Sequence, residues 1–259
     1  MQIPFQIESS CKMLLGILHI PDRIPDPCKV VVMCYGMNGN RVDNNRISRD
    51  FGVICEKKEI IYCRFDYIGL GVSDGEFYEI DMVSKVNDCI EVIDFVKNCI
   101  GCKDIEITLI GFSDGIRLIA NLLPQIKINR LIFWSPLFYT EKEYVDSRIG
   151  KKMIREPETG VVVFPFKGIF MNPKHLRQQM NLMNEIEIIK PYLASSLIVF
   201  GENDLAVINI FTNLSIRYFG NLNKNVKYID GADHLYSRSV WKNNLFELTV
   251  DFIKGENYG

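Results

Sequence analysis

The sequence has 259 residues, 47% hydrophobic and 24% charged, and 30 Lys and Arg nearly balance 32 Asp and Glu for a formal net charge of -2. A chain of this length and apolar content forms one large domain or two small ones and is not disordered. The charge argues against a dedicated nucleic-acid-binding protein, because affinity for phosphates comes from clustered Lys and Arg. No apolar run reaches the roughly 20 residues of a membrane span.

The cysteines and the N-terminus bear on the cellular compartment. Residues 1–10 contain Gln, Pro and Glu where a secretory signal has a basic start and an apolar run. We therefore expect a cytoplasmic protein in which the eight cysteines are reduced thiols that pack as small hydrophobes. Cys99 and Cys102 have CxxC spacing without a second pair or a neighbouring histidine, so we expect no metal site.

Short apolar segments alternate with longer segments of helical period along the chain. Strands are predicted at 3–7, 13–20, 29–35, 60–65, 105–111, 130–135, 196–201 and 226–229. Helices are predicted at 83–99, 113–123 and 241–254. This alternation indicates an α/β fold with a mainly parallel sheet.

One segment interrupts the alternation at 137–191. It is about 55 residues long, whereas a connection between strand and helix usually has about 2–6 residues. Its glycines and prolines exclude a single helix, so we expect short helices joined by turns. The sequence thus predicts a core formed by 1–136 and 192–259, with 137–191 as an insertion, which we interpret as a lid rather than as a decoration of the sheet edge.

One pentapeptide has the spacing of a nucleophile motif. Gly111, Ser113 and Gly115 form Gly-x-Ser-x-Gly between a predicted strand and a predicted helix. The glycines of such a motif permit a tight turn that exposes the serine hydroxyl, and the helix N-terminus lies beneath a developing oxyanion. The pentapeptide alone recurs by chance, but its position between strand and helix favours Ser113 as a nucleophile.

A serine nucleophile needs a base, and the chain has three histidines. His234 follows the last predicted strand, where an imidazole could reach the strand ends, whereas we interpret His19 and His175 as packing or surface residues. Asp204 follows the preceding strand and is the candidate acid that orients His234. The order Ser113, Asp204, His234, each after a predicted strand, is that of the α/β-hydrolase triad.

At these residues the chain resembles the α/β-hydrolase family, and the resemblance extends over nearly its whole length. Besides the triad, the segments 66–75 (DYIGLGVSDG), 201–204 (GEND) and 231–234 (GADH) are similar to family motifs and occur in the family's order. The resemblance implies an eight-stranded, mostly parallel sheet with helices on both faces and a lid after the sixth strand. In particular, the chain resembles small cytosolic serine esterases and thioesterases of that fold.

The same resemblance implies an oxyanion hole formed by two backbone amides. One is the amide of Asp114, and the other is that of Met37 in the loop after the third strand. The family commonly has histidine before the glycine of this loop, where this chain has Tyr35. It often has a second small residue after the motif, where this chain has Ile116.

Several further residues are candidates for substrate contact. The candidate substrate-binding residues are Tyr35, Phe138, Phe164 and Phe166. The alternative for the phenylalanines is packing of the lid on the core. Four cations of the insertion could attract the phosphate of a carrier-bound substrate, although we favour a solvated helix face: Arg148, Lys151, Lys152 and Arg155. Arg41, Asp43 and Arg46 follow the oxyanion loop and are interpreted as a structural charged brace.

The sequence predicts a serine hydrolase that cleaves a carboxylic ester or acyl thioester through an acyl-enzyme, without a cofactor or a metal. An acyltransferase with the same nucleophile stays open, as does a non-catalytic ligand-binding member of the fold. A haloperoxidase or carbon–carbon hydrolase would use the same triad. The acyl group, the leaving group and the oligomeric state do not follow from the sequence.

Overall fold

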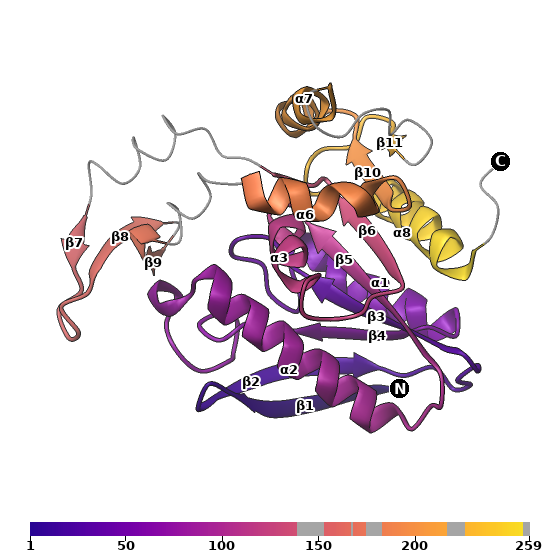
Figure 1. The fold of residues 1–259 in the computed structure, drawn as a ribbon, viewed down its shortest axis with the longest axis horizontal. Coiled ribbons are helices and arrows are strands. Elements are labelled where there is room, and N and C mark those ends of the chain that lie inside the picture. The colour runs from indigo at the N-terminus through magenta and orange to yellow at the C-terminus, as the bar shows by residue number, and fades with distance from the viewer. Residues whose placement is uncertain (139–152, 167, 175–182, 217–225, 256–259) are drawn as a thin grey trace.

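A computed structural model describes residues 1–138, 153–166, 168–174, 183–216 and 226–255. Its main sheet has eight strands in the spatial order β1 (Gln2–Ser9), β2 (Lys12–His19), β4 (Ile61–Phe65), β3 (Cys28–Cys34), β5 (Ile105–Phe112), β6 (Arg130–Trp134), β10 (Leu197–Gly201), β11 (Val226–Ile229) (Figure 1). The pairs β1/β2 and β2/β4 are antiparallel, and the other neighbours are parallel. The predicted α/β fold with a mostly parallel eight-stranded sheet is therefore confirmed.

Helices cover both faces of this sheet. The helices are α1 (Ile47–Lys57), α2 (Met82–Ile100), α3 (Gly115–Leu122), α6 (Met183–Leu193), α7 (Leu205–Leu214) and α8 (Ser239–Lys254), with two short 3-10 turns, η1 (Asn44–Arg46) and η2 (Phe77–Glu79). The sequence interpretation missed α1 and α7. α1 contains Gly52 in its interior, a residue type that disfavours a helix, and α7 is so apolar that its sequence shows no clear polar face.

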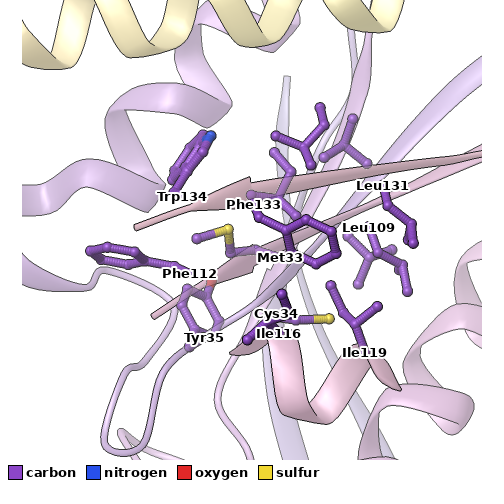
Figure 2. Close-up of a cluster of buried hydrophobic side chains, with 14 of the residues drawn as sticks. Met33, Cys34, Tyr35, Leu109, Phe112, Ile116, Ile119, Leu131, Phe133 and Trp134 are labelled. Carbon is purple, nitrogen blue, oxygen red and sulfur yellow. The ribbon is translucent and has the colours of Figure 1, made fainter. Parts of the chain in front are cut away.

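Side chains of β5 and β6 join the two helix layers (Figure 2). On one side of the sheet, Trp134 packs against Phe51 of α1 and Phe246 of α8, and its indole N–H donates to Thr249 Oγ1 at 3.0 Å. On the other side, fully buried Ile116 of α3 lies beneath the strands. The carboxyl end of β5 is thereby held between two packed layers.

The insertion contains a small antiparallel sheet. Its strands are β7 (Ile154–Arg155), β8 (Val162–Phe166) and β9 (Ile169–Met171). The expectation of short helices is wrong here, because Gly160 and Gly168 have positive φ and permit hairpin turns. Further along, α6 packs on α3, and the predicted end of the insertion at 191 falls inside α6.

The sheet of the insertion packs on the core through a second apolar cluster. Phe164 of β8 and Met171 of β9 are buried with Phe77 and Ile80 of the segment around η2. The side chain of Met37, from the predicted oxyanion loop, packs against the same cluster. The insertion therefore contacts the core beside the residues that the sequence assigned to the oxyanion hole.

The cysteines are free thiols, and five of them are buried: Cys28, Cys34, Cys55, Cys63 and Cys89. The packing interpretation is wrong for Cys11 and Cys99, which are exposed because they lie in a turn and at the end of α2. None of the described helices is long and apolar enough to cross a membrane.

Candidate active site

Ser113 lies in a sharp turn between β5 and α3. Its φ of 53° is in the left-handed region, which is strained for a residue with a Cβ atom. The Ser113 N–H donates to the carbonyl of Trp134 at 3.0 Å, and its own carbonyl accepts from the N–H of Leu137 at 3.0 Å. The end of β6 thus holds the strained backbone and fixes the serine above the sheet.

Close backbone packing requires the glycine at position 115, two residues after the serine. A Cβ atom on Gly115 would lie 2.1 Å from the carbonyl oxygen of Cys34, well inside van der Waals contact. One on Gly111 would lie 2.9 Å from Ile119 Cδ1. The motif spacing therefore reflects how closely α3 starts against β3 and β5, as well as the turn itself.

The structure brings the three predicted triad side chains together. His234 Nε2 lies 3.2 Å from Ser113 Oγ, and His234 Nδ1 lies 2.7 Å from Asp204 Oδ2. The Asp204 side chain is 7% exposed and that of His234 31%, so the acid is buried while the imidazole borders solvent. The ring of Phe112 stacks on the imidazole at a centroid distance of 5.8 Å. This arrangement can accept a proton at Nε2 and stabilise the resulting charge through the carboxylate.

Two hydrogen bonds donated by backbone N–H groups tie the loops of Asp204 and His234 to each other. Asn203 N–H donates to the carbonyl of Ala232 at 2.8 Å, and Gly231 N–H donates to Glu202 Oε2 at 3.0 Å. A Cβ atom on Gly201 would lie 2.5 Å from the Ala232 carbonyl oxygen. The two loops pack too closely for any larger residue there, which holds the acid and the histidine in register.

The predicted oxyanion loop lies against the nucleophile. A Cβ atom on Gly36 would lie 3.3 Å from Ser113 Cβ and 3.7 Å from the Asp114 nitrogen. Within the described part of the chain, no group accepts a hydrogen bond from the Met37 amide. The ammonium of Lys85 donates to the carbonyls of Gly36 at 3.2 Å and Met37 at 3.0 Å. Sequence reasoning missed Lys85, although a lysine one turn before Cys89, on the apolar face of α2, was a usable signal.

Tyr35 was predicted to bind substrate, and this prediction is wrong. Its side chain is fully buried, and its hydroxyl lies 2.9 Å from Ser48 Oγ, which in turn lies 2.6 Å from the Tyr62 hydroxyl. These hydroxyl contacts hold the ring in the core. Tyr35 therefore supports the predicted oxyanion loop from its core side.

The predicted aromatic contacts of the insertion are buried where they are described. Phe138 is 1% exposed and packs against Phe211, and Phe164 is 2% exposed in the apolar cluster around η2. These positions fit the alternative of packing on the core.

The side chain of Phe166 lies outside the described residues, as do Arg148, Lys151 and Lys152. Arg155, the remaining cation, donates to the carbonyl of Gly160 at 3.1 Å.

The predicted charged brace does not form among the described residues. Arg41 pairs with buried Asp66, whereas Arg46 contacts Asp43 through its backbone only. Asp43 Oδ1 accepts hydrogen bonds from Asn44, and Asp43 Oδ2 is buried without a partner. Burial raises the pKa of the Asp43 carboxyl to about 6, opposed by hydrogen bonds from Asn44 and by the nearby His234.

The raised pKa of the Asp43 carboxyl predicts how the free energy of unfolding depends on pH. Between about pH 4 and 6 the folded protein holds a proton on Asp43 that the unfolded chain releases, so stability falls as the pH rises through this window. Asp43→Asn is expected to raise the free energy of unfolding by about 2–3 kcal/mol at pH 7, and little at pH 4. Urea denaturation at both pH values measures this, with exposed Asp22→Asn as a control. An equal gain at both pH values would contradict it.

Comparison with known proteins identifies the fold. No protein-family model and no curated protein matches the sequence. Among solved structures, the chain is similar to the esterase Est1E from Butyrivibrio proteoclasticus with ferulic acid bound, at 21% identity and a TM-score of 0.75 over 97% of this chain and 98% of that one. It is similar to the α/β hydrolase GrgF from Penicillium sp. sh18, at 15% identity and a TM-score of 0.72 over 99% of both chains.

A third similar structure is the esterase Pf2001 from Pyrococcus furiosus, at 17% identity and a TM-score of 0.60 over 98% of this chain and 92% of that one. These neighbours are α/β-hydrolase-fold proteins, so the resemblance seen in the sequence is confirmed at the level of the fold. Because folds of this kind support many reactions, the reaction must be argued from the site.

Proposed function

We propose that the chain is a serine hydrolase that cleaves a carboxylic ester or acyl thioester through an acyl-enzyme. The observation that carries this proposal is the hydrogen-bonded series from Ser113 through His234 to Asp204, with Ser113 in a strained turn at the start of α3. Esterases and hydrolases among the structural neighbours support the same general class.

In this mechanism, Ser113 Oγ attacks the acyl carbon while His234 Nε2 takes the hydroxyl proton. The imidazolium, stabilised by the Asp204 carboxylate, then gives that proton to the leaving oxygen or sulfur as its bond to the acyl carbon breaks. Water attacks the acyl-enzyme, His234 takes the water proton and returns it to Ser113 Oγ, and the carboxylic acid leaves. The amides of Met37 and Asp114 would bind the oxyanion, each worth about 3 kcal/mol.

Covalent labelling tests the proposal. A fluorophosphonate probe is expected to label the protein at Ser113, identified by mass spectrometry of the peptide, and Ser113→Ala is expected to remain unlabelled. Labelling that persists in Ser113→Ala would refute the assignment of the nucleophile. An unlabelled wild type would favour the non-catalytic, ligand-binding alternative.

The substrate class is tested by a panel of p-nitrophenyl esters and acyl thioesters of increasing chain length. A feruloyl ester belongs in this panel because the Butyrivibrio esterase has ferulic acid bound. Release of acid is expected to be independent of added amines or alcohols. A product that contains the added amine or alcohol, formed at the expense of the acid, would instead identify an acyltransferase.

A further inference from the structure

Lys85, in the first turns of α2, is buried with 1% of its surface exposed. A buried ammonium group is costly unless its hydrogen bonds are satisfied. Lys85 donates to the carbonyl oxygens of Gly36 and Met37, and its ammonium lies 5.0 Å from the centre of the Tyr67 ring. The charge is therefore directed at two consecutive peptide groups of the loop beside Ser113.

The Gly36 carbonyl and the Met37 N–H belong to the same peptide group. Among the described residues the one cis peptide bond is at Asp26-Pro27, so this peptide is trans and its carbonyl and N–H point in opposite directions. A cation held on the carbonyl side fixes the direction of the N–H on the other side. It also polarises the group, which makes the N–H a stronger donor.

We propose, resting on the proposed function, that Lys85 is a positioning residue of the oxyanion hole. Its ammonium holds and polarises the Gly36–Met37 peptide, so that the Met37 N–H stabilises the negative oxygen that forms as Ser113 attacks the acyl carbon. Two of the three ammonium N–H groups donate to the carbonyls of Gly36 and Met37, so the charge acts on the oxyanion through this loop. Preorganised amides of this kind lower the barrier because they need no reorientation during the reaction.

The charged groups around Lys85 make this contribution depend on pH. Asp88 and Cys89 face it from its own helix, while Asp114 and Arg117, which pair with each other at 2.8 Å, face it from the start of α3. Burial lowers the pKa of Lys85 to about 8, with the negative charge of Asp114 opposing this shift. Lys85 is therefore charged below about pH 8 and loses its charge above it, where the peptide becomes less polarised.

The test compares Lys85→Met and Lys85→Arg with Lys97→Met, a substitution near the exposed end of the same helix. Loss of a complete oxyanion donor lowers kcat by about 100–1,000-fold, so loss of its support in Lys85→Met is expected to lower kcat by about 10–100-fold with KM nearly unchanged. The rate of labelling by the fluorophosphonate is expected to fall in parallel. Lys97→Met is expected to behave as the wild type.

The pH profile separates positioning from a purely structural role. The wild-type kcat is expected to decline above about pH 8, and Lys85→Arg is expected to retain most of the activity with this decline moved to higher pH. If Lys85→Met does not fold, the inference is tested by comparing the alkaline decline of kcat in the wild type with that in Lys85→Arg. An unchanged kcat in a folded Lys85→Met, or the same alkaline decline in Lys85→Arg, overturns the inference. A wild type that is neither labelled nor active overturns the proposed function instead.

Discussion

Ser113→Ala and His234→Ala are each expected to lower kcat for ester hydrolysis by about 10⁶-fold, and the double variant is expected to be no slower than either single variant. The reason is that the serine and the histidine act as one unit: without the base at Nε2, 3.2 Å away, the hydroxyl is not activated, and without the hydroxyl the base has no proton to take. Asp204→Asn is expected to cost less, about 10⁴-fold.

Steady-state and single-turnover kinetics on a chromogenic ester measure these losses. Ser195→Ala, at an exposed serine whose hydroxyl donates to the carbonyl of Tyr192, serves as the matched control and is expected to leave kcat unchanged. Circular dichroism checks that each variant is folded. Additive losses in the Ser113/His234 double variant would show that the two side chains act independently and would contradict the proposed mechanism.

Gly115→Ala is expected to destabilise the protein by about 3 kcal/mol or more and to abolish most of the activity. The new methyl group would lie 2.1 Å from the Cys34 carbonyl oxygen, a backbone atom that cannot rotate away. Relief of this clash must move the start of α3, and with it the Asp114 amide, away from β3. A decrease in the melting temperature of about 10 °C, together with loss of fluorophosphonate labelling, is the expected result.

Gly101→Ala provides the matched comparison. Gly101 has a φ of 67°, but a Cβ atom there would meet nothing within 4 Å, so this variant tests backbone strain without a clash. Its expected cost is about 1 kcal/mol, with activity retained. If Gly115→Ala were no more destabilising than Gly101→Ala, the close approach of α3 to β3 would not be what requires glycine.

Much of the fold was predictable because its signals are local. The buried strands at 105–111 and 130–135 are short apolar runs, and the glycines around Ser113 mark the turn that follows the first of them. Each predicted triad residue directly follows a strand, and parallel strands place their carboxyl ends at one edge of a sheet. That rule is sufficient to bring Ser113 and His234 near each other without knowledge of the packing.

Other features were not predictable because their signals are weak or depend on distant contacts. Nothing in the apolar run of α7 distinguishes a helix from a strand. The hairpins of the insertion follow from positive φ at Gly160 and Gly168, whereas glycine in a sequence indicates only a turn. Tyr35 was assigned to the substrate because of its place in the loop, but its ring direction depends on Ser48 and Tyr62, which belong to other elements.

By itself, the sequence determined the eight strands of the main sheet, the helices α2, α3 and α8, and the candidate triad of Ser113, His234 and Asp204, because strand periodicity and turn glycines act over a few residues. Only the tertiary structure decided the direction of each side chain and the partners of buried charges. Lys85 illustrates the difference: in the sequence it is one lysine of a helix, and in the fold its ammonium donates a hydrogen bond to the Gly36 carbonyl beside Ser113. Burial and hydrogen bonding across distant segments produce that role, and these arise only when the layers pack.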